Sequence, residues 1–217
     1  MHRQRIDRVA LARVGARAAA WLTARLGEGQ HAPDVTSLFH LGLRLCSSVT
    51  ARSAADLFSI DASIARLPAG GIDRIESAAL PGRPEQGACQ LASLPWSAAE
   101  NADFLGSLAL SRLSEGDLSG AAVAMRQSLR FGRPGAITRE AMAFMLMHQH
   151  PDGCFGDPAL ARSLDAALDE GRLRSQLAQT VQVLWAVNEY ANGLRRPVGA
   201  DGSMRGSKVG RDAHPCG

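Results

Sequence analysis

A short run in the second half of the chain carries residue types that bind metals in proteins. It contains two histidines, an aspartate and a cysteine: His148, His150, Asp152 and Cys154. Imidazole, carboxylate and thiolate ligands together suit tetrahedral Zn²⁺, and His214 could add a nitrogen. The same run also fits a turn at residues 151–153 with Cys154 half-buried beside it. We favour the turn, and expect no bound metal and no cofactor.

No other arrangement in the sequence is typical of a catalytic centre. The chain has no Gly-x-Ser-x-Gly nucleophile motif, and it has neither a phosphate-binding loop nor a dinucleotide fingerprint. His40 lies opposite the apolar side of its predicted helix, so we expect it to face solvent or a groove. The catalytic residues, and whether the protein is an enzyme, are therefore unknown from the sequence.

The composition predicts an all-α protein. Hydrophobic residues make up 46% of the 217 positions, which is enough for a sizeable core, whereas aromatic residues make up only 5%. Ala, Leu and Arg dominate, and these residues favour helices. A single lysine stands among the 24 basic residues. Arginine in place of lysine, with abundant Ala and Gly, is typical of a GC-rich genome, so we expect a bacterial source.

The N-terminal 30 residues concentrate positive charge. Six arginines against Asp7 and Glu28 give a local net charge of +4, while the chain as a whole carries +3. A basic amphipathic helix can lie on an anionic membrane, dock on an acidic partner, or simply pack on the body and solvate its arginines. For a recognition role, the candidate partner-binding residues are Arg3, Arg5, Arg8, Arg13 and Arg17. Because the rest of the chain lacks a broad basic face, we expect no nucleic-acid binding.

Cysteine usage and hydropathy bear on the compartment. Cys46, Cys89, Cys154 and Cys216 form no CxxC pair, and reduced thiols in a cytoplasm are the ordinary interpretation. No apolar run approaches the ~20 residues needed to span a bilayer. We therefore expect a cytoplasmic protein without a transmembrane segment. Its oligomeric state is unknown.

Hydrophobic periodicity predicts eight or nine helices in one domain over residues 1–195. This domain can be divided into two lobes, residues 1–67 and 97–195, joined by a connector rich in Pro and Gly at 68–96. Residues 196–217 have the composition of a disordered tail. Capping residues place helix starts at Asp34, Ser53, Ser97 and Thr138. The other predicted helices cover 3–26, 71–79, 118–131, 158–168 and 173–193.

The run that contains the candidate metal ligands resembles a known structural repeat. Phe144, Gln149, Asp152, Gly153 and Phe155 are similar to the repeat of aromatic, Gln, Gly and aromatic residues in the α/α toroid proteins, which include terpenoid cyclases and protein prenyltransferases. In that class the Gln and the aromatic residue tie one helix end to its neighbour. The resemblance covers mainly residues 97–193. It implies a curved stack of helices or an incomplete toroid, because a complete ring needs a longer chain.

The resemblance does not imply an activity. The Asp-rich acid motif of the cyclases is absent, and the Asp152-Gly153-Cys154 segment stands in the turn rather than in the context of the prenyltransferase zinc ligands. We therefore expect a non-catalytic binding or scaffold protein with a protein or peptide partner, accessory to a bacterial biosynthetic pathway. The alternative is an enzyme or lipid-binding module that holds an isoprenoid or another apolar substrate in a helical cavity.

Overall fold

The computed structural model describes residues 6–50, 97–156 and 170–195, and these residues contain helices but no strand. The predicted all-α class is therefore confirmed for this part of the chain. The six helices are α1 (Arg8–Gly27), α2 (Pro33–Thr50), α6 (Ala98–Ser114), α7 (Leu118–Arg130), α8 (Ala136–Met147) and α10 (Glu170–Arg195). None of these six helices is long and apolar enough to cross a membrane.

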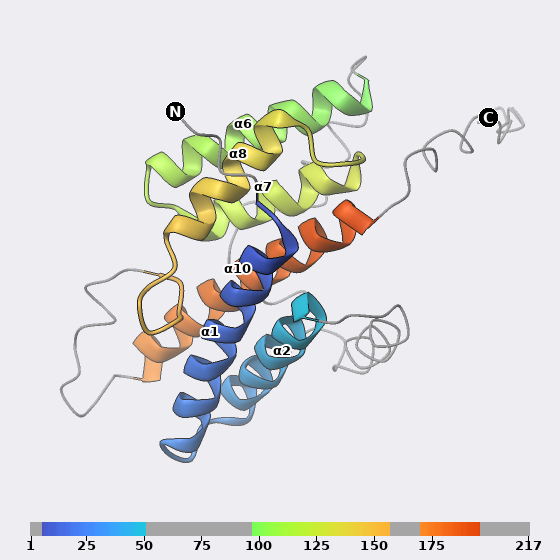
Figure 1. Ribbon diagram of the computed structural model, residues 1–217. Helices are drawn as coiled ribbons and strands as arrows, with labels where there is room; N and C mark the ends of the chain where they lie inside the picture. Colours follow the sequence, from blue (N-terminus) through green and yellow to red (C-terminus); the bar gives the residue numbers. More distant parts are fainter. Residues whose placement is uncertain (1–5, 51–96, 157–169, 196–217) are drawn as a thin grey trace, which may run out of the picture.

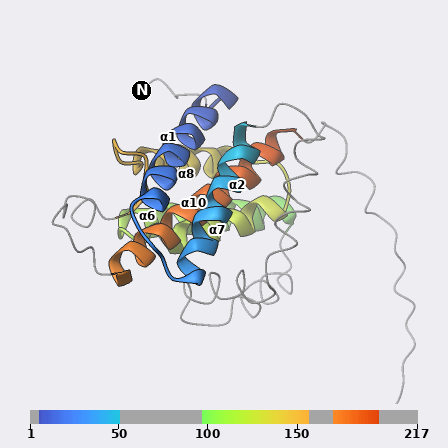
Figure 2. The same cartoon turned by 90° about the horizontal axis from the view of Figure 1, so that it is seen from below.

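Helix α10 lies at the centre of the molecule (Figures 1 and 2). It packs against α1 and α2 on one side and against α7 on another, and α6 and α8 cover α7. Residues 180–184 of α10 are all buried. A helix that is buried on every side belongs to a core rather than to a surface layer. Helices α1 and α2 of the first predicted lobe therefore pack on α10, and so does α7 of the second lobe.

Helices α1 and α2 form an antiparallel pair. The Asp7 carboxylate accepts a 2.8 Å hydrogen bond from the Ala10 backbone N–H, so α1 begins at Arg8 and not near residue 3 as predicted. A side-chain cap of this kind fixes a helix start because it satisfies a free N–H group. The pair approaches closely where Gly42 faces Leu22, since a Cβ at Gly42 would lie only 2.8 Å from Leu22 Cδ1.

Helices α6, α7 and α8 form the second group. The predicted capping box at Ser97 and Glu100 is present, and its hydrogen bonds lower the pKa of Glu100. The Ser128 hydroxyl of α7 lies 2.8 Å from the Ala102 carbonyl of α6 and 3.0 Å from the Thr138 hydroxyl of α8. One buried serine therefore links all three helices.

Two apolar clusters make up the core. One lies among α7, α8 and α10, with contributions from α1, and includes Met125, Met142 and Phe155. The other lies among α1, α2 and α10 and includes Phe39 and Cys154. The neighbours Cys154 and Phe155 therefore belong to different clusters, so the segment that carries them enters the core between the two groups of helices.

Several predictions fall outside the described residues. These are the helices at 53–67, 71–79 and 158–168, the connector at 68–96, the tail at 196–217, and the candidate residues Arg3, Arg5 and His214.

Candidate functional site

The segment from His148 to Gly156 forms a closed turn at the end of α8. The backbone N–H of Gly153 donates to the His150 carbonyl at 3.0 Å, and the N–H of His150 donates to the Cys154 carbonyl at 2.9 Å. Gln149 and Phe155 form an antiparallel bridge across the turn. The predicted turn over residues 151–153 is therefore present, and it brings Gln149, Asp152, Gly153 and Phe155 together.

Gln149 connects this turn to α1. Its Nε2 donates to the Gly153 carbonyl within the turn and to the Val14 carbonyl of α1, each at 2.9 Å. The resemblance implied that this glutamine ties its helix end to a neighbour. That the neighbour is α1, through Val14, could not be predicted from the sequence, because 135 residues separate the two positions.

Gly153 permits the close approach of the turn to α1. Its φ is +109°, a conformation that side chains disfavour. A Cβ at this position would also overlap the backbone carbonyl of Arg17. The Arg17 guanidinium in turn donates to the His150 carbonyl. The backbone of α1 and the turn therefore contact each other directly.

Thr180 holds the turn on α10. Its hydroxyl accepts from the Phe155 N–H at 3.1 Å and donates to the Phe155 carbonyl at 3.0 Å. Both residues are fully buried. This contact was not predicted from the sequence. A threonine inside an apolar helical stretch was the available signal, because a buried hydroxyl requires a partner.

Cys154 is held as a protonated thiol. Gln176 Nε2 of α10 donates to its Sγ at 3.0 Å, and Sγ donates to Asp152 Oδ1 at 3.3 Å. Burial, and then the hydrogen bond and charge of Asp152, raise the pKa of Cys154 to about 12. The side chain is completely buried, so the expectation that it would be half-buried was wrong.

The two histidines of the turn contact backbone carbonyls. His148 Nδ1 lies 3.2 Å from the Phe144 carbonyl, and His150 Nε2 lies 3.0 Å from the Gly156 carbonyl. Burial, and then the neighbouring His150, lower the pKa of His148. Within the described ranges, no three residues of the His, Cys, Asp or Glu types are grouped to hold a metal. The side chains of His148, His150, Asp152 and Cys154 instead make hydrogen bonds to other groups of the protein.

Phe144 does not join the rest of the predicted turn motif. Its side chain is 37% exposed on α8, and its ring lies edge-on to His148 with 5.1 Å between the ring centres. Phe144 and the buried Phe155 therefore have different environments. His40 is exposed on α2, as its position in the helical pattern predicted.

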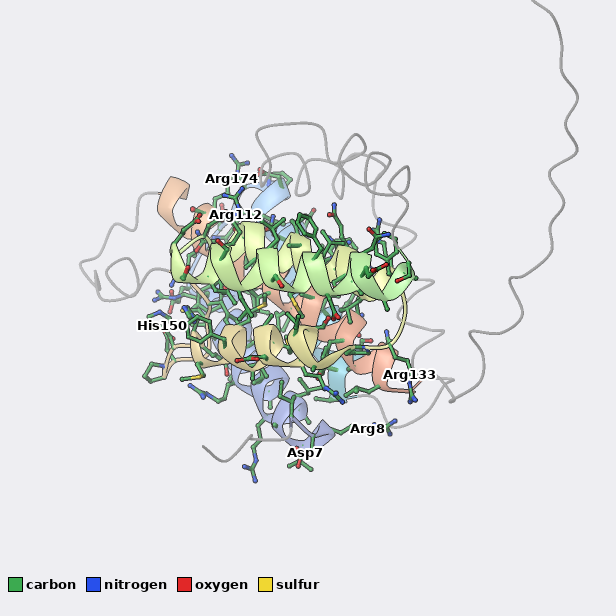
Figure 3. All side chains as sticks on the ribbon, turned by 90° about the horizontal axis from the view of Figure 1, so that it is seen from above. Asp7, Arg8, Arg112, Arg133, His150 and Arg174 are labelled. Atoms are coloured by element: carbon green, nitrogen blue, oxygen red, sulfur yellow. The ribbon has the colours of Figure 1, made fainter. Side chains whose placement is uncertain are left out.

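The predicted arginine set divides into residues with different contacts. Arg8 and Arg13 are exposed on α1, whereas Arg17 is engaged with the turn. Trp21 is buried and Val14 is partly buried against the core, so these residues hold α1 on the body. In Figure 3, Asp7 and Arg8 lie at the tip of α1, and His150 lies at the end of α8.

A buried charged group lies where α7 packs on α10. Arg126 of α7 donates from Nε to Glu189 of α10 at 3.1 Å, and its guanidinium lies 4.0 Å from the centre of the Trp185 ring. Buried charges need partners of this kind. This group was not predicted from the sequence, because 63 residues separate Arg126 and Glu189.

Taken together, the polar contacts around residues 148–156 connect α8 to α1 and α10. At this junction the Cys154 thiol is protonated and enclosed, and its Sγ donates to the Asp152 carboxylate. No protein-family model, no curated protein and no solved structure matches this chain.

Proposed function

We propose that this protein is a non-catalytic helical binding module that docks an acidic segment of a partner protein on the outward face of α1. The observation that carries the proposal is the exposure of Arg8 and Arg13 on a helix whose opposite face is buried. The acidic residues that flank the two ends of α1 have other roles. Asp7 caps the helix, and Glu28 pairs with Arg25 at 2.7 Å.

The packing of α1 favours an acidic protein over a membrane as its partner. A helix that lies on a membrane inserts its apolar face between the lipids. In α1 that face consists of Leu11, Ala18, Trp21 and Leu22, and all four are buried in the core. Membrane insertion would require α1 to leave the body of the protein, whereas an acidic protein surface needs only the exposed arginines.

The turn at residues 148–156 supports a non-catalytic role. Its cysteine, aspartate, glutamine and histidine side chains all contact the turn or a neighbouring helix. Cys154 would have to lose a proton against a pKa of about 12 before it could act as a nucleophile.

The architecture that we propose with this function is a curved helical stack or an incomplete α/α toroid. The antiparallel pairs α1–α2 and α6–α7 support it, as does the turn that ties the end of α8 to α10. An experimental structure of the whole chain tests this arrangement. A globular bundle without curvature would contradict it.

The functional proposal is tested by affinity capture from the native host, at low salt and at physiological salt. The test variant is Arg8→Gln with Arg13→Gln, and the control is Arg130→Gln with Arg133→Gln, which removes the same charge from exposed arginines elsewhere. Arg17 is left unchanged because it contacts the turn. The wild type and the control should capture the same acidic proteins at low salt, with losses at physiological salt, where charges are screened beyond about 8 Å.

The test variant should lose these proteins at both salt concentrations. If it captures the same proteins as the wild type, the α1 face is not the docking site. If the captured proteins have no acidic segment, the proposed class of partner is wrong.

A further inference from the structure

One ion pair joins α7 to α10 inside the protein. Arg126 of α7 is only 5% exposed, and its Nε donates to Glu189 Oε1 of α10 at 3.1 Å. The guanidinium also lies 4.0 Å from the centre of the Trp185 ring, one turn earlier on α10. The ion pair between Arg174 and Asp34 joins two helices as well, but both of its side chains are exposed. The Arg126 pair therefore loses far more contact with water on folding.

Stability alone does not explain why a pair of charges lies at this position. The free energy needed to take two charges out of water can exceed the attraction between them, and apolar side chains of similar size often replace a buried ion pair without loss of stability. The contact with the Trp185 ring adds a favourable cation–π interaction. Another role of Arg126 and Glu189 therefore has to be considered, which is to fix how the two helices are placed.

The side chains next to the pair are small. Ala122 lies one turn before Arg126 on the same face of α7, and Ala186 and Gly193 lie three and four residues from Glu189 on the same face of α10. Helices pack by fitting ridges of side chains into grooves, and small side chains form shallow ridges. An apolar interface that is poorly specified loses its unique packing before it loses stability. These small residues therefore fix the position of α7 along α10 only weakly.

We propose that Arg126 and Glu189 form a register lock, which selects one position of α7 along α10 and contributes little to the stability of the fold. A shift of α7 by one turn is a movement of about 5.4 Å. It would carry the guanidinium of Arg126 away from Glu189 and leave a buried charge without its carboxylate, which is strongly unfavourable. Single buried polar residues set the register of paired helices in the same way, at a cost in stability.

The register of α7 also positions α6 and α8. Ser128, two residues after Arg126, lies 2.8 Å from the Ala102 carbonyl of α6 and 3.0 Å from the Thr138 hydroxyl of α8. The register lock therefore places the group of three helices relative to α10. This inference does not depend on the proposed docking of a partner on α1.

The experiment replaces the pair with apolar side chains, Arg126→Met with Glu189→Leu. The matched control makes the same changes at the exposed ion pair near the end of α6, Arg112→Met with Glu115→Leu. Two quantities are measured on the full chain, the urea midpoint of unfolding and the indole N–H signal of Trp185 in a proton–nitrogen NMR spectrum. The chain has three tryptophans, and Trp185→Phe identifies the signal by its loss.

The apolar variant should keep or raise the urea midpoint, while its Trp185 signal splits or broadens because α7 occupies more than one register. The control should keep one sharp signal. If the apolar variant keeps both its stability and one sharp signal, apolar packing alone sets the register and the proposal is wrong. If its urea midpoint falls sharply, or if it does not fold, the pair stabilises the fold and the proposal is wrong for the opposite reason.

Discussion

The side chain of Gln149 donates to the Val14 carbonyl at 2.9 Å, across 135 residues of sequence. The same Nε2 also donates to Gly153 within its own turn. Gln149 therefore joins the first helix of the protein to the end of α8. A residue that looks local in the sequence thus contributes to the long-range packing.

Gln149→Ala should lower the free energy of unfolding by roughly 1–2 kcal/mol, because two carbonyls lose their hydrogen-bond donor. Urea denaturation measures the effect. Gln30→Ala is the control, since Gln30 is exposed in the connection between α1 and α2. An unchanged urea midpoint for Gln149→Ala would contradict the role given to this side chain.

Gly153→Ala should be much more harmful than a substitution at another glycine with positive φ. The new Cβ would be strained at φ +109° and would overlap the Arg17 carbonyl, with a total cost of roughly 3 kcal/mol or more. Gly116→Ala, at φ +79° with open space around it, should cost only about 1 kcal/mol. Thermal melts of the two variants give the comparison. Equal losses would show that the contact with α1 is not tight.

Cys154 and Cys46 should resist alkylation in the folded protein. Burial is the largest cause that raises the pKa of each thiol to about 12, and the thiolate is the reactive form. Iodoacetamide treatment at pH 8, followed by peptide mapping, should leave both unmodified until urea is added. Rapid labelling of Cys154 in the native protein would show that the junction opens.

The same raised pKa values predict a loss of stability at high pH. An unfolded cysteine ionises near pH 9.0, whereas the folded thiols stay protonated until about pH 12. The stabilising difference is therefore fully present below pH 9 and is lost as pH rises towards 12. Urea midpoints at pH 8 and pH 10 test this. Cys46→Ala should show a smaller pH dependence than the wild type.

Purified protein should contain far less than one equivalent of zinc. Cys154 is protonated and already contacts Gln176 and Asp152, so it is poorly placed as a thiolate ligand. Elemental analysis of protein prepared without chelators gives the answer. Near-stoichiometric zinc that disappears in Cys154→Ser would favour the prenyltransferase-like alternative.

A chain that ends at Arg195 should keep its fold. Arg195 is the last residue of α10, and the sequence beyond it has no apolar stripe. Its melting temperature should match that of the full chain. A large drop would mean that residues 196–217 pack on the body.

The sequence by itself determined the helical class, the capping box at Ser97 and Glu100, and the turn after Gln149. These features depend on neighbouring residues, whose propensities and hydrogen-bonding groups can be read along the chain. The start of α1 was predicted too early, because Ile6 fits the apolar spacing of the helix. The Asp7 carboxylate instead caps the Ala10 N–H, so the helix begins at Arg8.

Only the tertiary structure decided what these local features contact. The spacing of residues could not show that Gln149 reaches Val14, that Thr180 satisfies Phe155, or that Arg126 pairs with Glu189 beside Trp185. It also could not separate Arg17, which is engaged with the turn, from the exposed Arg8 and Arg13. Hydrogen bonds and burial at these positions depend on how helices distant in sequence pack around α10, and no local propensity encodes that arrangement.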